Sequence, residues 1–133
     1  MRTYVQSQTA KLLRRLAGEV ERTGQDTDPD HIHDLRVAIR RLNRCLRVFS
    51  QFYPGGAWKP VRKQLSALMH KAGEVRDCDI ALELIGKAGV TKRAAVMKSF
   101  EDRREKAARK LKSELSRWAG RNLPEKWREP LDV

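Results

Sequence analysis

The chain has 133 residues and a mass of 15.4 kDa, the size of one small domain. It carries 29 Lys and Arg against 17 Asp and Glu, a formal net charge of +12, and 40% of its residues are hydrophobic. This composition excludes a disordered basic tail, and no apolar run reaches the roughly 20 residues of a membrane span. Its start lacks the apolar stretch of a secretion signal, and its two cysteines, Cys45 and Cys78, fit no disulfide or metal pattern, so we expect a cytoplasmic protein without a metal or cofactor.

The first expected helix covers residues 3–22, where apolar and small residues recur at helical spacing. Residues 23–27 have the composition of a turn. Asp28 is then a suitable N-cap, with Pro29 at the first helical position, where its missing N–H costs nothing. The stripe expected to face the core is formed by Val5, Thr9, Leu12, Leu16 and Val20.

The second expected helix, over residues 29–53, gives the clearest pattern. Its apolar residues step alternately by three and four positions, which predicts a seam that packs against other helices. They are Ile32, Leu35, Ile39, Leu42, Leu46, Phe49 and Tyr53. At about 100° per residue, five basic or potentially basic side chains fall on one flank of this seam. They are His33, Arg36, Arg40, Arg44 and Arg47, whereas Arg41 falls on the far side.

Two further helices are expected after the break at Pro54 and the glycines that follow it. The third covers residues 58–85, and the fourth begins after Thr91, which is a suitable cap, and reaches about residue 118. The sequence therefore predicts an all-α, up-and-down four-helix bundle over residues 1–120, with a C-terminal tail over residues 121–133. Trp127 is expected to anchor this tail, and the basic groove to be lined mainly by the second helix.

The positive charge is concentrated in one part of the chain. Residues 31–63 contain eight Lys and Arg against Asp34 alone, a net of +7. In the fourth helix, by contrast, cations alternate with acids that can pair with them. Because unpaired arginines on one flank repel one another, and because the arginine fork binds phosphate oxygens in pairs, we interpret the flank as an oxyanion-binding face. Lys63 is expected to form a second wall of this groove.

Two segments resemble the CHAD family, the conserved histidine α-helical domain. Residues 33–42, HDLRVAIRRL, are similar to its HxxRVxxRRL pattern, and residues 73–80, GEVRDCDI, are similar to its Gly-x-x-Arg-Asp-x-Asp segment. The resemblance implies a helical domain that binds inorganic polyphosphate and is not itself catalytic. The sequence departs from the family pattern at Asn43, where family members often carry a basic residue. This length also suffices for only one of the two bundles of such a domain, which leads to the hypothesis of a homodimer.

The resemblance, the charge pattern and helix geometry together give expected roles for individual residues. We expect Asp77 and Asp79 to orient arginines rather than to perform chemistry, since residues two apart on a helix point in different directions. The expected polyphosphate ligands are His33, Arg36, Arg40, Arg41, Arg44, Arg47, Lys63 and Arg76. Association with polyphosphate granules follows from the resemblance alone.

Other functions remain open on the sequence alone. A nucleic-acid-binding protein is the main alternative, because the same electrostatics would attract DNA or RNA, even nonspecifically. A surface that stacks bases requires aromatic residues among the basic ones. Only 6% of the residues are aromatic, and none lies within the basic row, which argues against this alternative. A polyphosphate-processing enzyme would need clustered carboxylates around a metal or an activated nucleophile, and the basic region has neither. Docking on an acidic protein is a fourth possibility.

Overall fold

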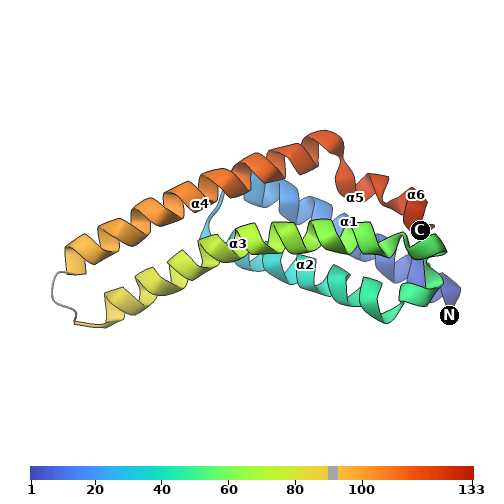
Figure 1. Cartoon of the computed structure of the whole chain (residues 1–133), viewed down its shortest axis with the longest axis horizontal. Coiled ribbons are helices and arrows are strands. Elements are labelled where there is room, and N and C mark those ends of the chain that lie inside the picture. Colours follow the sequence, from blue (N-terminus) through green and yellow to red (C-terminus); the bar gives the residue numbers. More distant parts are fainter. Residues whose placement is uncertain (90–92) are drawn as a thin grey trace.

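The computed structural model describes residues 1–89 and 93–133, and it confirms the prediction of an all-helical protein, with no strand in these residues. Thr91, the expected cap of the fourth helix, lies outside the described residues. No helix of the described ranges is both long and apolar enough to cross a membrane. Figure 1 shows the order of the elements: α1 (Arg2–Gln25), α2 (Pro29–Val48), η1 (Ser50–Phe52), η2 (Pro54–Gly56), α3 (Trp58–Lys87), α4 (Arg93–Arg121), α5 (Leu123–Lys126) and α6 (Arg128–Leu131).

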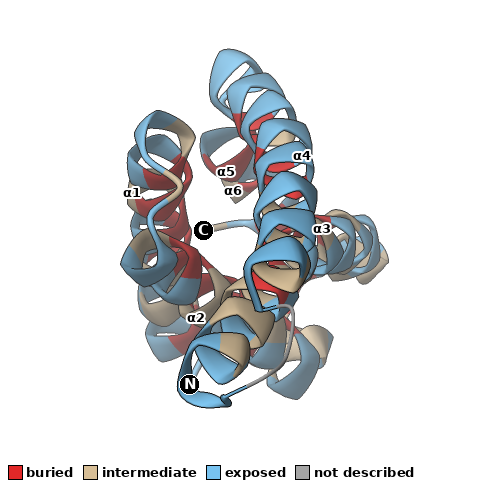
Figure 2. Ribbon diagram, turned by 90° about the vertical axis from the view of Figure 1, so that its left-hand side faces the viewer, coloured by how far each residue is buried: buried red, intermediate tan, exposed pale blue. Residues whose placement is uncertain are grey.

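The four long helices pack around a single core. Helix α1 contacts α2 and α4, and α3 contacts the same two helices from the other side, so each long helix has two neighbours. Figure 2 shows that the buried residues gather where the helices face one another. The seam predicted on α2 is confirmed for its five fully buried members, which are Ile32, Leu35, Ile39, Leu42 and Leu46.

Helix α2 ends at Val48, five residues before the predicted end at Tyr53. The chain then turns through η1 and η2, where Gly55 has φ 53° and Gly56 has φ 71°, in the left-handed region that glycine adopts without strain. Tyr53 still belongs to the core, because its hydroxyl lies 2.7 Å from the Thr9 hydroxyl of α1. This hydrogen bond ties the connection between α2 and α3 to the first helix.

The C-terminal segment expected as a tail packs against the bundle. After Asn122, whose left-handed backbone (φ 51°) ends α4, the chain forms α5 and α6. Leu123, Trp127 and Leu131 are buried in the common core. The Trp127 ring meets that of Trp118 edge-on, with 5.1 Å between ring centroids. The core therefore extends to the end of the chain.

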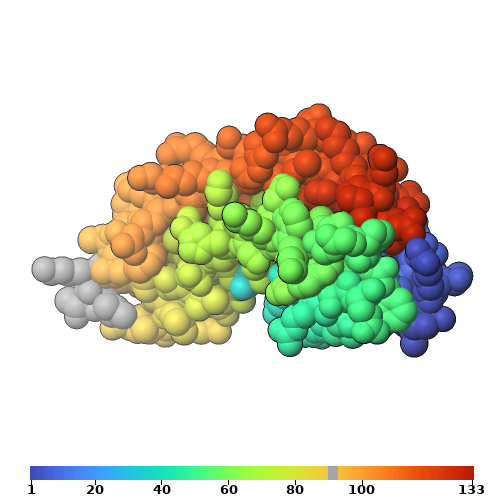
Figure 3. Space-filling view, turned by 45° about the vertical axis from the view of Figure 1, so that its right-hand side comes forward, coloured from blue at the N-terminus to red at the C-terminus, as the bar shows by residue number. Residues whose placement is uncertain are grey.

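Helices α3 and α4 run beyond the ends of α1 and α2 as a two-helix arm (residues 80–87 and 93–103; Figure 1). The space-filling view shows this arm, in yellow and orange, projecting past the rest of the molecule (Figure 3). With only two helices to cover them, Met97 and Phe100 stay partly exposed. Leu84 is 62% exposed for the same reason.

The arm is fastened where it leaves the bundle. The Arg104 guanidinium of α4 donates from Nε to Asp79 Oδ1 over 2.5 Å and from Nη2 to the Thr27 carbonyl over 2.6 Å. Asp79 lies on α3, and Thr27 lies in the connection between α1 and α2. One side chain thus joins three segments, and we call this contact the Arg104 clasp.

Candidate functional site

Helix α2 carries five arginines, and its local structure fixes the direction in which they project. The side chain of Asp28 accepts a hydrogen bond from the Asp30 amide over 2.9 Å and caps the helix start, with Pro29 in the first turn. The buried seam then sets the rotation of the helix and leaves the arginines outside the core. None of these five forms an ion pair within the described residues, whereas two cations of α1 and four of α4 do.

Three of the α2 arginines meet at one surface pocket between α2 and α3. This arginine pocket has a volume of about 440 Å³. It is lined by Arg40, Asn43, Arg44, Arg47, Val48 and Arg62. The Arg62 guanidinium of α3 donates from Nε to Asn43 Oδ1 over 2.8 Å, and its centre lies 5.9 Å from the centroid of the Trp58 ring. A neutral amide and an aromatic ring therefore hold Arg62 in place and leave its positive charge uncompensated.

A second group of arginines lies further toward the start of α2, where Arg36 is half-buried. Desolvation lowers the pKa of Arg36, the positive charges of Arg40 and Arg76 lower it further, and the negative charge of Asp77 acts in the opposite direction. Its Nε is buried without a hydrogen-bond partner among the described residues. A buried cationic donor without an acceptor is costly. We call Arg36, Arg40 and Arg76 the Arg36 cluster.

The match to a family model covers this whole arrangement. The model for the CHAD domain matches residues 7–132, nearly the entire chain. The chain belongs to the CHAD family. No curated protein and no solved structure matches it significantly.

The structure of this CHAD domain places the remaining predicted ligands apart from the arginine pocket. His33 and Lys63 are exposed on α2 and α3, and neither is among the residues that line it. Arg41 lies on the side of α2 that faces α1, where it lines a different pocket. That position agrees with the helical wheel, which places Arg41 across the seam from the other arginines.

The two acidic residues have separate environments. Asp79 does hold an arginine, but that arginine is Arg104 of α4 and not a member of the predicted ligand set. Asp77 is exposed and lines a pocket between α3 and α4, together with Arg103 and Lys106. In this CHAD domain the Arg-Asp-x-Asp segment therefore contributes Arg76 to the Arg36 cluster and Asp79 to the fastening of the arm.

Sequence reasoning missed Arg62 as a residue of the pocket. Arg62 and Lys63 are adjacent in the sequence, and Lys63 was the residue expected to form the second wall of the groove. Which of two adjacent residues faces α2 depends on how α2 and α3 pack. The Arg62–Asn43 hydrogen bond fixes this, and it also gives a role to the asparagine that departs from the family pattern.

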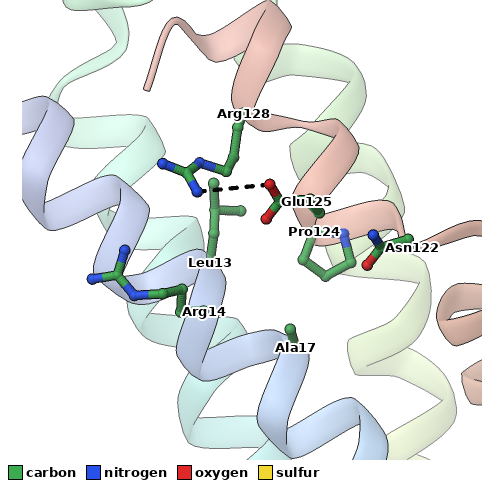
Figure 4. A pocket seen from close by; sticks show the side chains of 7 residues that line it. All are labelled: Leu13, Arg14, Ala17, Asn122, Pro124, Glu125 and Arg128. Carbon is green, nitrogen blue, oxygen red and sulfur yellow. Dashed lines mark ion pairs between the residues drawn. The ribbon is translucent and has the colours of Figure 1, made fainter.

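A hollow on the opposite side of the CHAD domain differs in its charge balance. It lies between α1 and the last two helices and has a volume of about 280 Å³ (Figure 4). Its Arg128 is 3.7 Å from Glu125, so this cation already has an acidic partner. Of the two sites, only the α2 surface presents several arginines without such partners, which makes it the candidate for binding an anion.

Proposed function

We propose that this CHAD domain binds inorganic polyphosphate on the surface formed by α2 and the adjoining part of α3, and that it does so without catalysing a reaction. The observation that carries the proposal is the Arg36 cluster, in which the half-buried Arg36 guanidinium lies beside the positive charges of Arg40 and Arg76 with no ion-pair partner among the described residues. A chain of phosphates would neutralise the cluster and accept hydrogen bonds from its exposed Arg40 guanidinium. The arginine pocket, about one helical turn further along α2, extends the same surface.

The absence of an acidic cluster favours binding over chemistry. Phosphoryl transfer ordinarily depends on carboxylates that hold a metal ion beside the phosphates. Within the described residues, no group of three or more His, Cys, Asp and Glu is placed to hold a metal ion. The α2 surface offers guanidinium groups, which bind phosphate strongly but neither attack it nor transfer protons at neutral pH.

Calorimetric competition binding tests the proposal. Long-chain polyphosphate, single-stranded DNA, duplex DNA and RNA are compared at equal phosphate concentration and near-physiological salt. We expect polyphosphate to bind most tightly, because its charge density is highest and the surface requires no bases. Tighter binding of any nucleic acid would overturn the proposal in favour of the nucleic-acid alternative.

Two double variants localise the binding. Arg36→Gln/Arg40→Gln removes two proposed phosphate contacts, and Lys112→Gln/Arg121→Gln removes the same charge from exposed positions of α4. Each lost phosphate contact lowers the salt dependence of log K by about 0.7, so the first variant should lower the slope by about 1.4. The second should leave the slope unchanged. Equal effects of the two variants would show that only net charge matters.

The homodimer suggested by the family resemblance forms a second part of the proposal. The arm leaves Ile80 39% and Leu84 62% exposed, and a second copy of the chain would cover them. We expect light scattering to give twice the mass of one chain, and Leu84→Asp to give a single chain with unchanged helicity. A monomeric parent protein at tens of micromolar would refute the dimer and leave polyphosphate binding to be judged by calorimetry.

A further inference from the structure

A second pocket adjoins the arginine pocket and has a different chemistry. It lies between α1 and α2, has a volume of about 300 Å³, and we call it the aromatic pocket. It is lined by Tyr4, Gln8, Leu12, Arg41, Arg44, Cys45, Val48 and Phe49. Arg44 and Val48 line both pockets, so the two lie on either side of α2 with these two side chains between them.

The aromatic pocket presents apolar surface that the fold does not need for its core. Tyr4 is 56% exposed and Val48 is 62% exposed, although both are large apolar side chains. The rings of Tyr4 and Phe49 pack edge to face, with centroids 6.4 Å apart, and form one wall. Leu12, which was expected in the core stripe of the first helix, is only partly buried and lines this pocket instead.

The combination restricts what can fill both pockets at once. The arginine pocket calls for phosphates, and the aromatic pocket, on the other flank of the same turns of α2, calls for a flat apolar group attached to them. Its wall also contains the Gln8 amide and the Arg41 and Arg44 guanidinium groups, which can bond to ring nitrogens and exocyclic oxygens. A nucleobase would pair with these polar groups and stack against the rings, whereas an alkyl chain would contact the rings alone.

We propose that the aromatic pocket takes the base of a nucleoside polyphosphate whose phosphates lie in the arginine pocket. The phosphate contacts rest on the function proposed above, but the base contacts do not. No aromatic residue lies within the basic row of α2. In the folded chain Tyr4, from α1, supplies an aromatic surface beside that row. The ligand is thus distinguished from plain polyphosphate by the nucleoside.

Calorimetry with matched ligands tests this inference. Adenosine triphosphate, tripolyphosphate and an octyl ester of triphosphate are titrated into the full chain at one fixed salt concentration, beside long-chain polyphosphate. The nucleotide carries no more charge than tripolyphosphate, so any advantage must come from the nucleoside. We expect the nucleotide to bind about tenfold more tightly than tripolyphosphate, the gain typical of one stacked base. Equal affinities, or a larger gain for the octyl ester, would overturn the inference.

Single variants place the ligand. Tyr4→Ala should remove the advantage of the nucleotide and leave the affinity for tripolyphosphate unchanged, and Tyr4→Phe, which retains the ring, should preserve it. Arg44→Gln should weaken both ligands several-fold, and Lys112→Gln on α4 should weaken neither. Persistence of the advantage in Tyr4→Ala would refute the site, with circular dichroism confirming that the variant is folded.

The outcomes separate the two proposals. If long-chain polyphosphate binds and the nucleotide has no advantage, the aromatic site is refuted and the proposed function stands. If the nucleotide binds with an advantage that depends on Tyr4 and long-chain polyphosphate does not bind, the reverse holds. If none of the ligands binds, both proposals fail.

Discussion

The Arg104 clasp is the contact whose loss should affect stability most clearly. Asp79 is nearly buried, with 8% of its side chain exposed, and Arg104 is 21% exposed. The Arg104→Met variant keeps most of the apolar side chain but removes the guanidinium. It leaves the Asp79 carboxylate buried without its cation and the Thr27 carbonyl without a donor. We expect a marked loss of stability without a change of fold.

The expected magnitude follows from the burial of the pair. Removing one partner of a buried ion pair costs about 3–5 kcal/mol, because the other charge stays desolvated and unpaired. Since part of Arg104 is exposed and water can reach the gap, we expect about 3 kcal/mol. The double variant Arg104→Met/Asp79→Leu removes both charges, so it should recover most of this loss.

Urea unfolding followed by circular dichroism measures the effect, with an unchanged dependence on urea showing that the folded and unfolded states remain comparable. Lys98→Met is the matched control, because its ion pair with Asp102 joins two exposed side chains of the same helix and should contribute nothing measurable. A loss below about 1 kcal/mol for Arg104→Met, or a double variant as unstable as the single one, would show that the clasp does not stabilise the fold as argued.

Three further predictions concern stability. Trp127→Ala should cost about 3–5 kcal/mol in urea unfolding, because it removes a buried ring packed on Trp118; a small loss would mean that α5 and α6 are not part of the core. Asp28→Ala should cost about 1 kcal/mol by removing the cap of α2, and Asp28→Asn should retain most of it; equal losses would contradict the capping role. The hydrogen bond from Arg117, partly opposed by desolvation, and a further bond from Trp118 hold the pKa of Glu114 below its ordinary 4.5. The ionised Glu114 therefore contributes its full stabilisation above pH 4.5 and loses it as the pH falls through the lower pKa of the folded state. Glu114→Gln should reduce the loss of unfolding free energy with acid in urea unfolding at several pH values. An unchanged dependence on pH would contradict this.

The sequence was most informative where one pattern repeats over several turns. The seam of α2 maintains its spacing from Ile32 to Leu46, and all five of its predicted members up to Leu46 are fully buried. In α1 the pattern is looser, and the prediction placed Leu12 in the core although its neighbour Leu13 is the buried residue. Adjacent helical residues differ by about 100°, so a stripe with few members does not fix the rotation of its helix.

Tertiary contacts account for what the sequence left out. Helices α5 and α6 are too short for a repeating pattern, so their buried side chains were not recognisable before the packing of α1 and α4 was known. The arginine partner of Asp79 could not be predicted, because Arg104 lies 25 positions further along the chain. The aromatic pocket could not be predicted either, because Tyr4 lies near the start of α1 and Phe49 follows the end of α2.

The arginines of this protein divide into two groups with different physical consequences. Arg104 and Arg117 have acidic partners and stabilise the fold without a ligand, whereas the Arg36 cluster opposes folding through repulsion and an unsatisfied donor. An anion bound to that cluster, as we propose, would relieve the repulsion, so it would bind the folded chain in preference to the unfolded one. Stability must then rise with ligand concentration, by about 2.7 kcal/mol at one hundred times the dissociation constant. That gain should depend on Arg36 and be indifferent to the Arg104 clasp, because the clasp is complete before any ligand arrives.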